Sequence, residues 1–121
     1  MFEISVRSDF AAAHRLNNYK GACENLHGHN FVVEASVICS GLDKSFIAID
    51  FKELKKKLNS VLDELDHTYL NDNKYFQDTN PTSEMIAKYI YDKLKEKISN
   101  GCKPKKVSVY ETKNSKATYF E

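Results

Sequence analysis

The sequence predicts an α+β fold: a four-stranded antiparallel sheet with two helices on one face, in the order strand, strand, helix, helix, strand, strand. Three observations support this. Apolar and polar residues alternate near both ends of the chain, as in half-buried strands. Two segments between them carry apolar residues at helical spacing. The length of 121 residues suits one domain, residues 1–121.

The first predicted strand has its apolar residues at even positions, namely Phe2, Ile4, Val6, Phe10 and Ala12. His14 continues this set, so an imidazole ends an apolar face. The second strand covers residues 30–39, and His27 and His29 precede it on its more apolar, odd-numbered face. As antiparallel neighbours, the two strands would bring His14 close to His27 and His29 at one end of the sheet.

The first predicted helix begins at Asp50, with Glu53 three residues later as in a capping box. Its apolar face consists of Phe51, Leu54, Leu58, Val61, Leu62 and Leu65. The three lysines at 55–57 suggest a solvated face, with binding of a triphosphate as the alternative interpretation. The helix is expected to end at Asp66 and His67.

The second predicted helix starts with Asn80 as its cap and Pro81 at the first helical position. Its apolar residues repeat every fourth position at Ile86, Ile90, Leu94 and Ile98, and Gly101 ends it. Two strands follow around a turn at Asn114 and Ser115. Glu111 continues the face of Val107 and Val109, which places a carboxylate at the end of another apolar face.

Composition excludes several classes of protein. Lys and Arg number 18 against 17 Asp and Glu, which argues against a nucleic-acid partner or a membrane surface. No apolar run approaches the length of a membrane span, and the N-terminus does not resemble a signal peptide. The cysteines, Cys23, Cys39 and Cys102, are odd in number and lack a paired spacing. We therefore expect no disulfide framework and a reducing, cytoplasmic compartment.

Two histidines two residues apart, His27 and His29, are the first candidate for chemistry. On a strand they point to one face about 6.6 Å apart, close enough to converge on one metal ion. The pair alone fits equally well two unliganded histidines at a strand start. Asp66 beside His67 leaves a similar choice between a polar helix end and a carboxylate that tunes an imidazole for proton transfer.

Six segments taken in order resemble the 6-pyruvoyl-tetrahydropterin synthase family, and within it the bacterial 6-carboxy-5,6,7,8-tetrahydropterin synthases of queuosine biosynthesis. They are Phe-Ala-Ala-Ala-His at 10–14, Cys-x-x-x-His-Gly-His at 23–29, Ile-Asp-Phe at 49–51, Leu-Asp-His at 65–67 with Leu-Asn at 70–71, Asn-Pro-Thr-Ser-Glu at 80–84, and Val-Tyr-Glu-Thr at 109–112. The resemblance covers essentially the whole chain. It implies the tunnelling fold, in which subunits join their sheets into a barrel. It also implies a homohexamer, a dimer of trimers, with active sites at subunit interfaces.

By the same resemblance, His14, His27 and His29 hold a zinc ion that leaves a position open for substrate hydroxyls. Cys23 is implied as the base, because a thiol near a dication can ionise near neutral pH.

The resemblance assigns further roles. His67, oriented by Asp66, would shuttle protons. Glu111 would join that relay or hold the pterin ring, and Thr82 and Ser83 would contact the pterin.

The implied substrate is 7,8-dihydroneopterin triphosphate, and the implied products are 6-carboxy-5,6,7,8-tetrahydropterin, acetaldehyde and triphosphate. Three residues separate Cys23 from His27, as in the carboxy enzymes, whereas the animal pyruvoyl enzymes have a longer spacing. Three alternatives remain: a 6-pyruvoyl synthase acting on the same substrate, a non-catalytic protein whose structural zinc takes Cys23 as fourth ligand, and a pterin aldolase or epimerase. The placed histidines disfavour the last, because that type needs no zinc.

Overall fold

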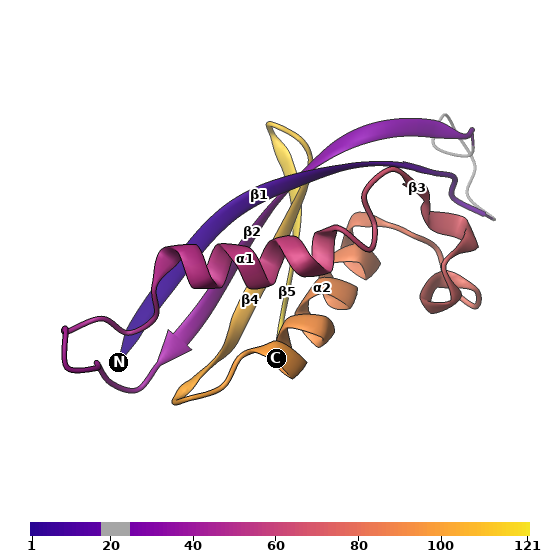
Figure 1. The fold of residues 1–121 in the computed structure, drawn as a ribbon. Helices are drawn as coiled ribbons and strands as arrows, with labels where there is room; N and C mark the ends of the chain where they lie inside the picture. The colour runs from indigo at the N-terminus through magenta and orange to yellow at the C-terminus, as the bar shows by residue number, and fades with distance from the viewer. Residues whose placement is uncertain (18–24) are drawn as a thin grey trace.

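The computed structural model describes residues 1–17 and 25–121. The strands and helices are β1 (Phe2–His14), β2 (His27–Cys39), α1 (Phe51–Leu62), β3 (Thr68–Tyr69), α2 (Ser83–Lys97), β4 (Cys102–Thr112) and β5 (Ser115–Phe120). Two single turns of 3₁₀ helix, Leu70–Asp72 and Lys74–Phe76, lie between β3 and α2. Both long helices lie on the same side of the curved sheet (Figure 1), which confirms the α+β prediction.

The sheet within the described residues has five strands in the order β3-β1-β2-β4-β5. β1, β2, β4 and β5 pair in antiparallel fashion, as expected, but β3 runs parallel to β1. The prediction of four antiparallel strands in the order ββααββ was therefore wrong in this respect. A strand of only two residues is too short for an alternating pattern, so the sequence gives no sign of it.

The register of β1 and β2 decides the position of the histidines. The two strands pair over their full length, from Phe2 opposite Cys39 to His14 opposite His27. β4 pairs with the other edge of β2, with a register shift between Ser36 and Val37. One end of the sheet thus carries imidazoles on two neighbouring strands.

The core lies between the helices and the face of the sheet that carries the predicted apolar residues. Phe10, Phe31, Leu54, Leu58 and Ile90 are at most 2% exposed there. Phe51, expected in the helical core face, is 65% exposed instead; it is the first residue of α1 and lines a surface hollow with Phe2 and Ile4 of β1. Leu65 is buried as expected, but in the turns that follow α1.

The helix ends differ in detail from the prediction. Asp50 caps α1 by accepting a hydrogen bond from the Lys52 N–H at 2.7 Å, as expected. Glu53 forms an ion pair with Lys57 at 3.3 Å, and α1 ends at Leu62.

The cap of α2 is Thr82, whose hydroxyl accepts from the Met85 N–H, so the assignment of Asn80 as cap was wrong. The Asn80 side chain hydrogen-bonds to another segment instead. α2 ends at Lys97, and Gly101 lies beyond it in a turn with a φ of 82°.

Two of the three cysteines are joined, which corrects the expectation of unpaired thiols. Cys39, at the end of β2, and Cys102, at the start of β4, face each other across the two strands and form a disulfide. The two cysteines are 63 residues apart in the sequence, and their pairing depends on the register of two distant strands, so the sequence pattern could not predict it. The cysteine count therefore no longer supports a reducing compartment.

In the part of the chain that the structure describes, neither helix has the length and hydrophobicity needed to cross a membrane.

Candidate metal centre and active site

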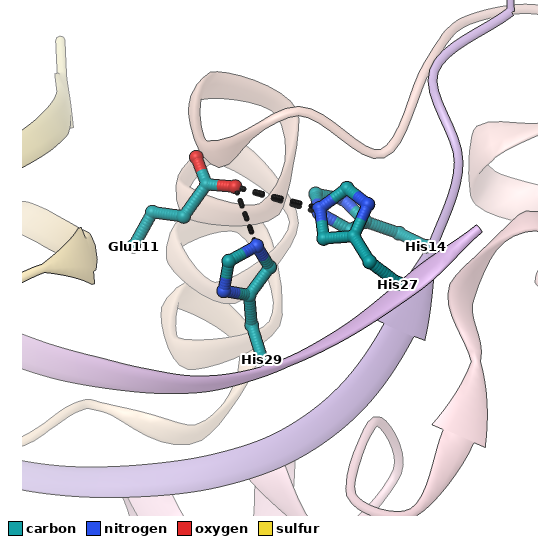
Figure 2. Close-up of side chains that lie close together, drawn as sticks. All are labelled: His14, His27, His29 and Glu111. Atoms are coloured by element: carbon teal, nitrogen blue, oxygen red, sulfur yellow. Dashed lines mark hydrogen bonds and ion pairs between the residues drawn. The ribbon is translucent and has the colours of Figure 1, made fainter. Parts of the chain in front are cut away.

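Three imidazoles and one carboxylate converge at one end of the sheet (Figure 2). β1 supplies His14, β2 supplies His27 and His29, and β4 supplies Glu111. One ligand atom from each residue lies within 4.8 Å of those from the other three. The convergence follows from the register, because His14 and His27 are direct partners and His29 is two residues further on the same face.

Hydrogen bonds to backbone carbonyls orient two of the imidazoles. The Nδ1 of His14 lies 2.8 Å from the carbonyl oxygen of Pro81, and the Nδ1 of His27 lies 2.7 Å from that of Asn25. A carbonyl can only accept, so each Nδ1 carries the proton. The Nε2 of each neutral ring then carries a lone pair.

These two Nε2 atoms face each other at 3.0 Å. Two lone pairs at this distance repel unless a cation or a shared proton lies between them. A metal ion satisfies both at once, and the carbonyls are the outer-shell partners that metal-binding histidines usually have.

Glu111 completes the cluster. One of its carboxylate oxygens lies 3.0 Å from the Nε2 of His29, 3.6 Å from that of His14 and 3.9 Å from that of His27. Burial lowers the pKa of His29; Glu111 opposes this effect, and the imidazoles of His27 and His14 add to it. A neutral imidazole is the form that binds a metal.

The donor set fits zinc. Imidazole nitrogens and a carboxylate oxygen are ordinary Zn²⁺ ligands, and three histidines leave a fourth tetrahedral position. His14 is 2% exposed, whereas His27, His29 and Glu111 are about one-quarter to one-third exposed. The cluster can therefore hold a metal ion that is anchored on one side and accessible from the other.

Asp66 and His67 form a hydrogen-bonded pair at the edge of β1. The Oδ2 of Asp66 lies 2.8 Å from the Nδ1 of His67, and its Oδ1 accepts from the Ala11 N–H at 2.8 Å. The backbone N–H of His67 donates to the Ala11 carbonyl, and His67 has a φ of 57°. The Ala11 N–H, and then the His67 ring, lower the pKa of Asp66 below its ordinary 3.8.

The pair does not join the metal cluster. The His67 side chain is 82% exposed, and among the described residues no hydrogen bond or ion pair links it to the cluster. His67 does line, with His29 and Ala13, an open depression of about 610 Å³. The imidazole that could move protons therefore shares the lining of a hollow with one residue of the cluster, His29.

The remaining predicted site residues have separate positions. The Thr82 hydroxyl caps α2. The Ser83 hydroxyl oxygen is buried without a hydrogen-bond partner in the described structure. Cys23, the predicted base, lies outside the described residues.

Sequence reasoning missed two asparagines that hold the chain after His14. The Asn71 side chain bonds to both the N–H and the carbonyl of Arg15, at 2.9 and 2.7 Å. The Asn80 side chain does the same at Asn17, at 2.7 and 2.8 Å. The amide composition of both side chains permits such paired bonds, but nothing in the sequence pattern identifies the partners. The carbonyls of Pro81 and Asn25 were missed for the same reason.

Known proteins resemble this chain over nearly its whole length. The sequence profile of the family described as 6-pyruvoyl tetrahydropterin synthase matches residues 3–121. A 6-carboxy-5,6,7,8-tetrahydropterin synthase from Synechocystis sp. is 38% identical over 125 residues, covering 99% of this chain and 94% of the relative. A dihydroneopterin monophosphate aldolase from Pyrococcus furiosus is 37% identical over 108 residues, covering 89% and 88%.

The fold agrees with these matches. The solved structure of a 6-pyruvoyl tetrahydropterin synthase from Caenorhabditis elegans superposes with a TM-score of 0.85 at 32% sequence identity, and the match covers 99% of this chain and 95% of the other. The chain belongs to the 6-pyruvoyl tetrahydropterin synthase family.

Proposed function

We propose that residues 1–121 form a single-domain, zinc-dependent lyase. It converts 7,8-dihydroneopterin triphosphate to 6-carboxy-5,6,7,8-tetrahydropterin, with release of acetaldehyde and triphosphate, in queuosine biosynthesis. The observation that carries the proposal is the convergence of the Nε2 atoms of His14 and His27, which face each other at 3.0 Å, beside His29. The 38% identity to the Synechocystis 6-carboxy-5,6,7,8-tetrahydropterin synthase supports the product.

The metal ligands would be His14, His27 and His29. When bound, Zn²⁺ acts as a Lewis acid that lowers the pKa of substrate hydroxyl groups. The carbonyls of Pro81 and Asn25 fix the two ring tautomers, so the ligand atoms are oriented before the metal binds. The buried side chain of His14 would anchor the site, and the partly exposed side chains of His27 and His29 would leave the metal accessible to the substrate.

Proton transfer falls to groups around this centre. In the proposal, Cys23 removes a proton from the substrate, and His67 moves protons at its Nε2 while Asp66 holds its Nδ1–H. The lowered pKa of Asp66 supports this role, because the carboxylate stays ionised near neutral pH.

Three residues would contact the pterin. Glu111 holds the ring by accepting its N–H groups or joins the relay, and Thr82 and Ser83 add contacts. The buried, unpartnered hydroxyl of Ser83 is consistent with a hydrogen bond to a ligand.

Assembly is part of the proposal. We infer a homohexamer, a dimer of trimers, in which active sites lie between subunits. The exposed position of His67, away from the cluster of its own chain, supports a proton relay completed by a neighbouring subunit. The proposal places the enzyme in the cytoplasm, where a triphosphate too highly charged to cross membranes would be retained.

Product identification tests the proposed function. Supplying 7,8-dihydroneopterin triphosphate under anaerobic conditions should yield 6-carboxy-5,6,7,8-tetrahydropterin and acetaldehyde in equal amounts by mass spectrometry. The matched control is the His27→Ala variant, which lacks one metal ligand. Absence of both products with zinc-loaded wild-type protein would refute the proposal.

A second candidate is a 6-pyruvoyl synthase. The observation that favours it is the TM-score of 0.85 and 32% identity to the Caenorhabditis elegans enzyme of that name. The same assay separates the two, because this reaction gives a 6-pyruvoyl product without acetaldehyde. The 37% identity to the Pyrococcus furiosus aldolase makes the use of a phosphorylated dihydroneopterin as an aldolase substrate a further outcome to look for.

A further inference from the structure

Two asparagine side chains, those of Asn71 and Asn80, hold the backbone immediately after His14. The ladder between β1 and β2 ends at the pair of His14 and His27, and β3 pairs with β1 only before that point. Within the described residues, the segment 15–17 is therefore held by these two side chains and not by a strand. The end of β1 that carries His14 thus depends on a distant part of the chain.

Each asparagine bonds in the way that a peptide group of a neighbouring strand would. The Asn71 Oδ1 accepts from the Arg15 N–H at 2.9 Å, and its Nδ2 donates to the Arg15 carbonyl at 2.7 Å. Asn80 makes the same two bonds to Asn17, at 2.7 and 2.8 Å. Because an N–H can only donate and a carbonyl can only accept, these partners fix the orientation of both amides. Each side chain satisfies both backbone groups of one residue, as in a hydrogen-bonded strand pair.

The bonded residues continue one edge of β1. Ala11, Arg15 and Asn17 are separated by even numbers of residues, the spacing at which the backbone groups of a strand point to the same edge. At Ala11, the N–H donates to Asp66 and the carbonyl accepts from the His67 N–H, at 2.8 and 2.6 Å. Partners from the chain between the two long helices therefore follow this edge as far as Asn17.

The Asn80 side chain is also linked to the imidazole of His14. Asn80 directly precedes Pro81, whose carbonyl oxygen lies 2.8 Å from the Nδ1 of His14. The Asn80 carbonyl accepts from the Thr82 N–H at 2.8 Å, and Thr82 caps α2. Residues 80 and 81 thus bond both to the His14 ring and to the backbone three residues after it, with α2 as a fixed support.

Asn71 starts from a similarly anchored position. It lies in the 3₁₀ turn Leu70–Asp72, where the side chain of Leu70 is fully buried. Its carbonyl accepts from the Gln77 side chain at 3.3 Å. The bonds of Asn71 to Arg15 therefore tie the residue next to His14 to a turn that is packed into the core.

We propose that Asn71 and Asn80 are positioning residues for the metal centre. They fix the backbone that follows His14 and so hold its imidazole in place before the metal binds. The inference rests on the proposed function in taking His14 as a metal ligand, but it does not depend on the substrate. A ligand that is already ordered loses less conformational entropy on binding, so the two asparagines should strengthen metal binding as well as the fold.

The competing explanation is that the two asparagines stabilise only the fold, and Asn59 provides the matched control for it. This asparagine of α1 is also half-buried and also bonds to β1, through the Ser8 hydroxyl, six residues before His14. Asn59→Ala should therefore lower the free energy of unfolding and leave the zinc affinity unchanged.

Competition with a chromophoric chelator measures the zinc affinity in the absence of substrate. Asn80→Ala should weaken zinc binding roughly tenfold, at the lower end of the range of about 10- to 100-fold for outer-shell changes. Asn71→Ala should weaken it by a smaller factor, and it keeps the test decisive if Asn80→Ala does not fold. Urea unfolding of the metal-free proteins measures the stability of each variant in parallel.

The absorption spectrum of the Co²⁺-loaded protein gives a second readout, because its ligand-field bands report the geometry of the bound ligands. The bands should change in Asn80→Ala and stay as in the wild type in Asn59→Ala. A change that affects only the stability of the fold would not produce this difference.

The proposal is overturned if Asn71→Ala and Asn80→Ala both bind zinc like the wild type, or if Asn59→Ala weakens binding as much as they do. Wild-type protein that binds no zinc would refute the positioning role together with the metal centre. If zinc affinity depends on the two asparagines but 7,8-dihydroneopterin triphosphate is not converted, the proposed reaction fails and the positioning role stands.

Discussion

His27 is a proposed metal ligand whose position is set by the strand register and whose ring is oriented by a hydrogen bond to the backbone. Its Nδ1 is tied to Asn25 and its Nε2 faces that of His14. His27→Ala should reduce zinc affinity by on the order of a hundredfold or more, since even outer-shell changes cost about 10- to 100-fold. Metal analysis after dialysis against a weak chelator measures this. Full occupancy in the variant would refute the assignment.

Glu111 provides the matched control for that experiment. Its carboxylate lies 3.0 Å from His29, but in the proposed function it binds substrate and is not a ligand. Glu111→Gln should therefore retain zinc and lose turnover. Loss of zinc from this variant as severe as from His27→Ala would make Glu111 a fourth ligand.

Asp66 determines which nitrogen of His67 carries the proton. In Asp66→Asn the amide oxygen can still accept from the Ala11 N–H, but the amide nitrogen then donates towards Nδ1 of His67. The ring would take the wrong tautomer, so turnover should fall about a hundredfold while zinc content stays constant. Steady-state kinetics with metal analysis checks this, and unchanged turnover would remove the dyad from the mechanism.

The pH dependence of the same pair has a definite sign. The pKa of Asp66 is lowered in the folded protein, so its stabilising contribution is complete above the ordinary value of 3.8 and is lost as the pH falls through the lowered value. Asp66 should therefore cause no loss of activity or stability between about pH 5 and 8. In urea unfolding below about pH 5, the free energy of unfolding of Asp66→Asn should therefore lack this contribution to the decrease seen in the wild type.

At the level of elements, the disulfide joins β2 to β4 at the end of the sheet opposite the histidines. It closes a loop of sequence separation 63 that contains both helices. Cys102→Ser should lower the free energy of unfolding by about 2–4 kcal/mol, chiefly by releasing the unfolded chain. Thermal melts with and without reductant measure the effect, and reductant should destabilise the wild type but not the variant.

The redox state also bears on the compartment, because structural disulfides are rare in reducing cytosol. Mass spectrometry of alkylated protein, quenched directly from cells, counts the thiols. Three alkylated cysteines together with a melt insensitive to reductant would contradict the disulfide.

The sequence predicted the long elements well and the short ones poorly. Alternation over many residues identified β1 and β2 and hence the meeting of His14 with His27 and His29. It could not identify β3, which has two residues and is held by Ala12 and Ala13 of β1. The cap of α2 was misplaced because Asn, Pro and Thr are all favourable near a helix start, and only tertiary contacts show that Asn80 is bonded to Asn17.

At the level of the whole molecule, the single chain exposes surfaces of the kind that usually form interfaces with other subunits. The helices cover one face of the sheet, β5 and the short β3 are edge strands, and Phe46 is 81% exposed. Exposed edges tend to pair with other chains. Light scattering at micromolar concentration should give the mass of a hexamer, and a stable monomer would contradict both the assembly and an active site shared between subunits.

Only the part of the site that follows from the alternation of side chains along the strands could be predicted. Three ligands share the same face of two long strands, so alternation was enough to place them. The carbonyls that orient His14 and His27, and the paired hydrogen bonds of Asn71 and Asn80, belong to loops. The approach of Glu111 to His29 depends on the end of β4, where the register with β5 shifts between Tyr110 and Thr112. No local pattern in the sequence encodes such contacts.

X-ray absorption at the zinc edge of the resting protein identifies the atoms bound to the metal and thereby tests whether three histidines, without Cys23, hold the zinc ion. Zinc held by His14, His27 and His29 should show a shell of nitrogen and oxygen only at about 2.0–2.1 Å, with scattering from three imidazoles and no sulfur. Cys23→Ala should give the same spectrum and lose turnover, since Cys23 is proposed as a base and not as a ligand. A sulfur at about 2.3 Å that disappears in Cys23→Ala would show that Cys23 is a zinc ligand and not the base, as in a closed structural zinc site.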